Sequence, residues 1–260
     1  RKLVVIDDRV GYTGSMNMVD PRFFKQDAGV GQWVDIMIRV QGPVVPLMWS
    51  TFVWDWEMET GERLLDSLQH EPEAWPQTNY RAQLIPSGPF VGGDCIQQSL
   101  LMAIYQARHH LVLTTPYFVP DDPLAAALSS AAARGVLVQL VLPARNDSLM
   151  ANHASNSFME DLLAAGVEIY RYDAGLLHTK SVLVDDDFAL VGTVNLDRRS
   201  LWLNFEITLL IDNPVFVAEM NQLVQGYMLE ATPMSLTQWR ARPWYKKLLE
   251  NIFYLFSPLL

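Results

Sequence analysis

Short runs of aliphatic and β-branched residues alternate along this chain with longer stretches in which apolar residues recur at helical spacing. The short runs at 2–6, 111–115, 136–142, 167–172 and 180–184 predict buried strands. The longer stretches at 95–109, 123–134 and 153–165 predict helices, and Gly135 and Gly166 stand where the last two would end. Strands that alternate with helices predict an α/β sandwich with mixed sheets.

The polar residues around two of the predicted strands repeat. Five of them recur 178 positions later: Lys2, Asp7, Gly14, Ser15 and Asn17 correspond to Lys180, Asp185, Gly192, Thr193 and Asn195. In each copy a strand leads into an acidic turn and a second strand, so both copies are expected to be hairpins. A repeat of this kind predicts a duplicated fold with two half-sites.

The correspondence extends beyond the hairpins. Asp35 aligns with Glu206 at an offset of 171, and Pro43 aligns with Pro214, each followed by an apolar helical stretch. We therefore predict that 1–60 is the carboxyl-terminal part of a first half and that 61–80 is a linker. Residues 81–232 would form the second half, and 233–260 an amphipathic tail.

Composition and charge narrow the function. Half of the chain is hydrophobic, enough for a packed core, and the single cysteine, Cys95, favours a reducing compartment. The formal net charge of −10 argues against nucleic acid as a partner, because nucleic-acid binding works largely through basic residues. No apolar run reaches the length needed to span a bilayer. Since the first residue is Arg1 and not Met, we expect a fragment or a processed chain.

The second copy holds the candidate chemistry. His178 and Lys180 are two residues apart on a strand, so both side chains project to one face. The ammonium can stabilise phosphate oxygens while the imidazole attacks phosphorus or moves protons. Asp185 and its counterpart Asp7 belong to the candidate catalytic set, but Asp185 lies at the opposite parity and in the turn, so a structural role is expected for it. Lys2 is the counterpart of Lys180.

The expected partners of this pair come from the same repeat. We place the carboxylate of Glu206 against His178, where it would fix the imidazole tautomer; Asp35 is its counterpart in the first copy. Four residues are candidate hydrogen-bond donors to phosphate oxygens: Asn195, Thr193, Asn17 and Ser15. A lone His-x-Lys is common by chance, but its repetition with the other residues at fixed spacing is not.

The spacing His-x-Lys-x4-Asp-x6-Gly-[Ser/Thr]-x-Asn resembles the signature of the phospholipase D superfamily. The segments 12–17, 27–33, 115–120, 175–180 and 191–197, with the end at 256–260, resemble bacterial cardiolipin synthases across nearly the whole chain. The resemblance implies a duplicated α-β-α sandwich with two pseudo-symmetric halves sharing one active site. It also implies catalysis with neither metal nor cofactor.

The resemblance further implies the reaction. One histidine would attack the phosphorus of a phosphatidylglycerol, and the other would protonate the departing glycerol and then activate a second phosphatidylglycerol, giving cardiolipin. The position equivalent to His178 in the first copy is the one just before Arg1, so we expect the 260-residue chain alone to be inactive. Which histidine is the nucleophile, and the oligomeric state, stay open.

Location and partners follow from the same resemblance. Family members carry an amino-terminal membrane region, which implies the bacterial inner membrane. The tail from Trp239 combines Trp, Tyr and cationic residues with an apolar stripe, which favours contact with an anionic membrane surface over packing on the domain. Tyr117 and Phe118 follow a strand and are candidates for the lipid entrance or, equally, for the core. The alternatives are a phospholipase D-type phosphodiester hydrolase and a non-catalytic lipid-binding fragment.

Overall fold

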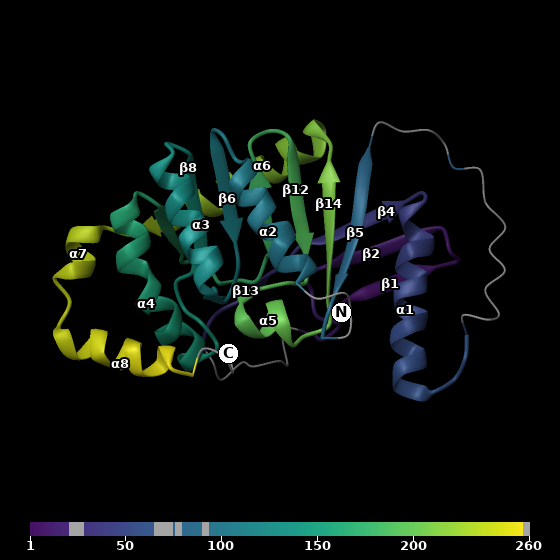
Figure 1. Cartoon of the computed structure of the whole chain (residues 1–260), viewed down its shortest axis with the longest axis horizontal. Coiled ribbons are helices and arrows are strands. Elements are labelled where there is room, and N and C mark those ends of the chain that lie inside the picture. The colour runs from purple at the N-terminus through teal and green to yellow at the C-terminus, as the bar shows by residue number, and fades with distance from the viewer. Residues whose placement is uncertain (21–28, 65–74, 76–79, 90–93, 257–260) are drawn as a thin grey trace.

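The computed structural model describes residues 1–20, 29–64, 75, 80–89 and 94–256. Its centre is a mixed eight-stranded sheet in the order β15-β9-β8-β6-β11-β12-β14-β5. A three-stranded antiparallel sheet, β1-β2-β4, lies beside its β14 and β5 end (Figure 1). The predicted linker at 61–80 falls mostly outside the described residues.

The strands of the large sheet come from 81–233. They are β5 (Arg81–Ser87), β6 (His110–Thr114), β8 (Leu137–Pro143), β9 (Glu168–Tyr172), β11 (Ser181–Val184), β12 (Phe188–Gly192), β14 (Glu206–Asp212) and β15 (Ala231–Pro233). β6, β8 and β9 are parallel to one another, and β11, β12, β14 and β5 form antiparallel ladders. The expected mixed sheet is therefore confirmed.

The small sheet comes from the first 41 residues. It consists of β1 (Leu3–Ile6), β2 (Val10–Gly14) and β4 (Met37–Gln41), with β1 and β2 forming a hairpin. β11 and β12 form the matching hairpin in the large sheet. Asp7 and Asp185, at the two turns, both have positive φ, which aspartate tolerates better than most residues. The two predicted hairpins are thus confirmed, and their turns share the same backbone feature.

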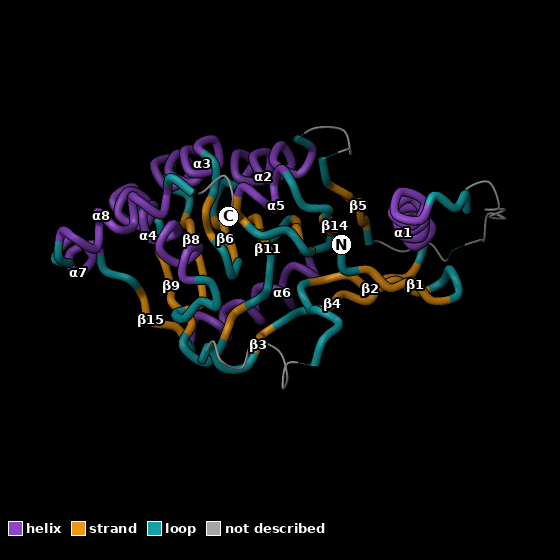
Figure 2. Tube along the Cα trace, turned by 90° about the horizontal axis from the view of Figure 1, so that it is seen from below, coloured by secondary structure: helices purple, strands orange, loops and turns teal. Residues whose placement is uncertain are grey.

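Helices cover both faces of the large sheet (Figure 2). On one face lie α2 (Cys95–Gln106), α3 (Asp122–Ala133) and α4 (Leu149–Ala165); on the other lies α6 (Pro214–Leu229). α1 (Val44–Thr60) packs on β1 and β5, and the short α5 (Arg198–Trp202) follows β13 (Leu196–Asp197). The tail forms α7 (Leu236–Arg240) and α8 (Trp244–Tyr254). This is the predicted three-layer α/β sandwich.

Local chemistry explains where the helices begin and end. Ser148 caps α4 by accepting a hydrogen bond from the Ala151 amide, so this helix starts four residues before the predicted 153. α2 ends at Gln106 and not at 109, because the following backbone amides are hydrogen-bonded elsewhere, to Asp185. Among the described residues, no helix combines the length and the apolar character needed to cross a bilayer.

Candidate active site

A two-strand ladder joins the two halves of the repeat at His178. β3 (Trp33–Val34) runs parallel to β10 (Leu176–Leu177), and the His178 amide donates to the Val34 carbonyl at 2.9 Å. Gly175 lets the strands approach, since a Cβ there would lie 2.3 Å from the Gln32 carbonyl oxygen. The ladder brings the residue after Val34 alongside the His178 side chain.

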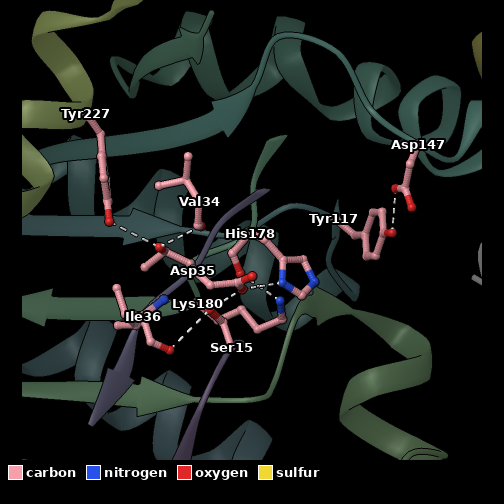
Figure 3. A network of polar contacts seen from close by, with 10 residues as sticks. Ser15, Val34, Asp35, Ile36, Tyr117, Asp147, His178, Lys180 and Tyr227 are labelled. Atoms are coloured by element: carbon pink, nitrogen blue, oxygen red, sulfur yellow. Dashed lines mark hydrogen bonds and ion pairs between the residues drawn. The ribbon is translucent and has the colours of Figure 1, made fainter. Parts of the chain in front are cut away.

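That residue is Asp35, and it holds the imidazole (Figure 3). Its Oδ1 lies 2.6 Å from Nδ1 of His178 and also accepts a hydrogen bond of 2.6 Å from the Ser15 hydroxyl. With Nδ1–H donating to the carboxylate, Nε2 is left with its lone pair for chemistry. The expectation that Glu206 would lie against His178 is wrong, because the acid comes from the other half.

Glu206 makes the equivalent contacts in the other half-site. The Thr193 hydroxyl donates to its carboxylate, as Ser15 does to Asp35, and the Ile207 amide donates to Thr193 as the Ile36 amide does to Ser15. The amino-terminal nitrogen of Arg1 donates to the Phe205 carbonyl at 2.9 Å. Phe205 precedes Glu206 as Val34 precedes Asp35, and Arg1 contacts Phe205 as His178 contacts Val34. Each acid therefore lies beside the lysine-containing motif of the opposite half.

These contacts correct two expected phosphate ligands. The hydroxyl protons of Ser15 and Thr193 are used on the carboxylates, so these residues orient the acids and are not free to donate to a phosphate. The Asn195 side chain donates to the Ser200 hydroxyl at 3.2 Å, while its Oδ1 is buried without a partner among the described residues. Asn17 is half-buried, and its role as a phosphate ligand stays a prediction.

Two lysines meet at the base of the site. Lys180 is buried, and its Nζ donates to the His178 carbonyl at 2.8 Å. Burial and then the nearby Lys2 ammonium lower the pKa of Lys180 to about 7, against the opposing effect of Asp35, Glu206 and Asp197. A bound phosphate would supply the missing negative charge and favour the ammonium form. The ammonium form of Lys180 is therefore expected to be stabilised when an anion enters the site.

The protonation of the His178–Asp35 pair follows from its surroundings. Burial lowers the pKa of His178 below its ordinary value, while the hydrogen bond that His178 donates to Asp35 opposes the shift and Lys180 reinforces it. Burial raises the pKa of Asp35, but hydrogen bonds from His178 and Ser15 outweigh it and the net pKa is lowered. At neutral pH the pair is a neutral imidazole donating to a carboxylate, which is the form needed for a nucleophile or a base.

An aromatic ring that the sequence did not single out packs against this imidazole. The Trp33 and His178 ring centroids are 4.7 Å apart, with the ring planes tilted by 55°. Trp33 belongs to β3, so the same ladder that supplies Asp35 supplies this contact. Trp33 and Asp35 flank Val34 of β3. The sequence alone does not show that this strand pairs with β10, because the pairing joins distant segments of the two halves.

Tyr117 and Phe118 have different environments. Phe118 is 1% exposed and lies in the main core, so of its two expected places the core is the one observed, and its candidacy for the lipid entrance is wrong. Tyr117 lines a cavity of about 360 Å³ with Asn195, Asp197 and others, and its hydroxyl donates to Asp147 at 2.6 Å. In Figure 3 the far nitrogen of the His178 ring points toward the Tyr117 side, away from Asp35.

Asp185 acts on the backbone. Its carboxylate accepts hydrogen bonds from the amides of Arg108, His109 and His110, at 3.1, 2.8 and 2.8 Å, which ties the β11–β12 turn to the start of β6. Burial raises the pKa of Asp185, but these backbone hydrogen bonds together lower it by more than burial raises it. The net pKa therefore lies below the ordinary value. The contacts are those of a structural residue, and they place Asp185 apart from the phosphate-binding groups.

Replacing Asp185 by alanine (D185A) is expected to cost about 1–2 kcal/mol of unfolding free energy at pH 7, a value discounted for partial exposure. Because the folded pKa is depressed, this stability is present above the unfolded pKa and is lost as pH falls through the folded pKa. Urea unfolding at pH 7 and pH 3 should show the difference shrinking in acid. D187A removes the same charge from the same turn and should change little; equal losses in the two variants would contradict the role.

No group of three or more His, Cys, Asp or Glu side chains in the described part of the chain is placed to hold a metal ion. The described geometry offers the chemistry of two neighbouring lysines, His178 and two hydrogen-bonded carboxylates, around a position that suits a phosphate group. A histidine held by a carboxylate beside a buried ammonium can serve in phosphoryl transfer, as nucleophile or as acid and base.

Known proteins resemble this chain over part or all of its length. Residues 100–228 match the family model described as "Cardiolipin synthase, PLD-like domain". The whole chain is 51% identical to "Cardiolipin synthase A" of Pectobacterium carotovorum subsp. carotovorum (strain PC1) and of Proteus mirabilis (strain HI4320), covering 54% of each. The chain thus spans about half the length of the curated relatives it matches.

Solved structures show the same fold at low sequence identity. A phosphatidylserine synthase from Haemophilus influenzae Rd KW20 matches 100% of the chain and 70% of its own length, with a TM-score of 0.73 and 17% identity. Nuc from Salmonella typhimurium, a phospholipase D family member, covers 60% of this chain and 99% of its own, with a TM-score of 0.52 and 19% identity. With its fold, its repeated motif and these relatives, the chain belongs to the bacterial cardiolipin synthase family of the phospholipase D superfamily.

Proposed function

We propose that the protein containing this chain transfers a phosphatidyl group from one phosphatidylglycerol to the hydroxyl of a second, releasing glycerol and forming cardiolipin. The observation that carries the proposal is the 2.6 Å contact between His178 of one half and Asp35 of the other, beside Lys180. It makes a single site from two halves. The names of the 51%-identical relatives support the lipid product.

The proposed reaction has two steps on two histidines. In the first, an imidazole nitrogen bonds to phosphorus as the bond from phosphorus to the glycerol oxygen breaks, and the second histidine gives its proton to that oxygen. In the second, that histidine takes the proton of the incoming lipid hydroxyl, whose oxygen bonds to phosphorus as the histidine–phosphorus bond breaks. The lysines hold the phosphate oxygens throughout, and the proposal requires no metal or cofactor.

The second histidine is proposed for the position just before Arg1, which the 178-residue offset aligns with His178. Glu206 would serve it as Asp35 serves His178. Thr193 already orients Glu206, and the Arg1 nitrogen lies against Phe205, so a side chain at that position would be within reach of the Glu206 carboxylate. We leave the nucleophile unassigned between the two histidines, since the half-sites are nearly equivalent.

Product analysis with the full-length protein tests this function. The reaction is run on phosphatidylglycerol vesicles in water enriched in oxygen-18, and the products are measured by mass spectrometry. Cardiolipin and glycerol should form in equal amounts. Transfer to a lipid leaves the products unlabelled. Phosphatidic acid carrying oxygen-18 as the main product would instead establish the rival hydrolase, and no turnover would favour the non-catalytic alternative.

We also propose that the site faces an anionic membrane surface, at the bacterial inner membrane. α8 and α5 lie along the edge of the molecule at which β14 begins, beside the site (Figure 1). Apolar side chains are exposed on both: Trp202 and Leu203 on and after α5, and Trp244, Leu248, Ile252 and Leu255 on and after α8. Aromatic and aliphatic residues of this kind suit the headgroup boundary of a bilayer.

The tail cations contribute less to that surface than the sequence implied. Arg240 and Lys247 are paired with Glu160, and Arg242 forms a two-point contact with Glu250. Their charges are partly neutralised within the protein, so the apolar side chains would dominate binding.

The double variant W244S/L255S is therefore expected to bind phosphatidylglycerol vesicles about tenfold more weakly, since it removes two apolar groups from the surface. Vesicle sedimentation with the 260-residue chain, in which an amino-terminal membrane region cannot mask the effect of the tail, would measure this. Y105S removes an exposed aromatic from the last turn of α2, at the opposite edge of the sheet, and should bind as before. Unchanged binding by the double variant would contradict this orientation.

A further inference from the structure

A second cavity, with cationic side chains in its lining, lies away from His178, between the sheet and the tail. It measures about 500 Å³ and is enclosed by the carboxyl ends of β8 and β9, the first turns of α4 and the helices α7 and α8. The carboxyl ends of parallel strands are where α/β folds most often bind ligands. Its lining shares no residue with the His178–Asp35 site.

Cations dominate this cavity although the chain as a whole is acidic. Among the described residues that line it, Arg171, Arg242 and Lys246 are cationic, and Glu250 supplies the one carboxylate. Glu250 is engaged by Arg242 through both oxygens, at 2.6 and 3.1 Å. The local excess of positive charge is therefore left to Arg171 and Lys246.

Arg171 is the least compensated of these cations. Its contacts in the described structure are to neutral groups: the Asn156 side-chain oxygen at 2.9 Å, the Met234 sulfur at 3.3 Å and the Pro143 carbonyl at 3.5 Å. Burial, and then Arg242, lower the pKa of Arg171 to about 10, with Glu250 opposing, so it keeps its charge at neutral pH. A half-buried guanidinium with no carboxylate in contact is stabilised when an anion supplies the partner.

Two further polar atoms at the same cavity lack partners. Nε1 of Trp239 and Nδ1 of His153 are buried without a hydrogen bond in the described structure. Both rings are fixed: Arg242 lies 3.2 Å from the Trp239 ring centroid, and His153 stacks on Phe253 with centroids 5.0 Å apart. Both residues line the cavity, so the Trp239 ring is placed to report on what binds there.

We propose that this cavity is a binding site for a phosphate-bearing anion, held by Arg171 and Lys246. A phosphate group offers the several acceptor oxygens and the negative charge that these groups lack. The ligand could be free phosphate or the headgroup of an anionic lipid, which share this chemistry. The site stands independently of the proposed transfer reaction.

Fluorine NMR of the chain labelled with 5-fluorotryptophan tests the proposal. The Trp239 signal is assigned by its loss in W239F, and the Trp33 signal, beside His178, reports the catalytic site separately. Inorganic phosphate, titrated at constant ionic strength, should shift the Trp239 signal in a saturable way. Dihexanoyl phosphatidylglycerol in monomeric form is the second probe: tighter binding than phosphate indicates a lipid headgroup as the source, and equal or weaker binding indicates free phosphate.

Neighbouring lysines provide the matched variants. K246Q removes a cation that lines the cavity and should weaken binding about three- to tenfold, whereas K247Q removes the same charge outside it and should leave binding unchanged. Absence of a saturable Trp239 shift with both probes would overturn the proposal. Equal weakening by K246Q and K247Q would also overturn it, because it would show only a general attraction of anions.

Discussion

Replacing His178 by glutamine (H178Q) in the full-length protein is expected to lower kcat for phosphatidyl transfer by at least about 10⁴-fold. The imidazole is either the atom that bonds to phosphorus or the group that moves the glycerol proton, and glutamine can do neither. Buried and held at 2.6 Å from Asp35, His178 has no described neighbour that could take over its role. Cardiolipin formation from phosphatidylglycerol vesicles is the measurement.

H109Q is the matched control for that variant. His109 is exposed, at the end of the segment between α2 and β6, and only its backbone amide contacts Asp185. Its substitution should leave both the fold and kcat unchanged. If H178Q kept more than a few per cent of the original activity while remaining folded, His178 would not be a catalytic residue.

The second large effect is expected at Asp35, in the other half of the repeat. D35N should reduce kcat by about 10²- to 10⁴-fold with a smaller change in KM, since it removes the charge that fixes the His178 tautomer and stabilises the imidazolium. D35E keeps the carboxylate and should recover part of the activity. A D35N variant with normal kcat would show that the contact at 2.6 Å positions the histidine without contributing to the chemistry.

The repeat and the strands were predictable because they depend on local pattern. Residues around Lys2 and Lys180 recur at one offset, and the β-branched runs that contain them form the two hairpins. The parity of His178 and Lys180, and the placement of Asp185 in the turn, also follow from strand geometry alone. These features need no knowledge of how the halves are arranged.

The acid partner of His178 was not predictable in this way. Within one copy of the repeat, Glu206 follows His178 on a later strand, and local order favours that pairing. In the structure each acid instead lies in the half-site of the other copy. β3 pairs with β10 and places Asp35 beside His178, while Phe205 and Glu206 lie beside Arg1. Pairing between distant segments is a property of the assembled halves.

Phe118 illustrates a second limit. The sequence left the lipid entrance and the core equally open for Tyr117 and Phe118. In the structure β7 (Phe118–Val119) pairs with β13, Phe118 lies in the core and Tyr117 lines the cavity. Likewise, Ser15 and Thr193 could donate to phosphate or to carboxylate, and their sequence context does not distinguish the two. Only the proximity of Asp35 and Glu206 decides it.

The central claim is that the site is shared, with Asp35 of the first half acting on His178 of the second. NMR titration of the His178 ring in the unsubstituted protein, D35N and E206Q tests it most directly. Loss of the Asp35 charge should lower the pKa of His178 further, because Asp35 opposes the effect of burial, and E206Q should leave that pKa nearly unchanged. An unchanged pKa in D35N, or an equal shift in E206Q, would contradict the shared site.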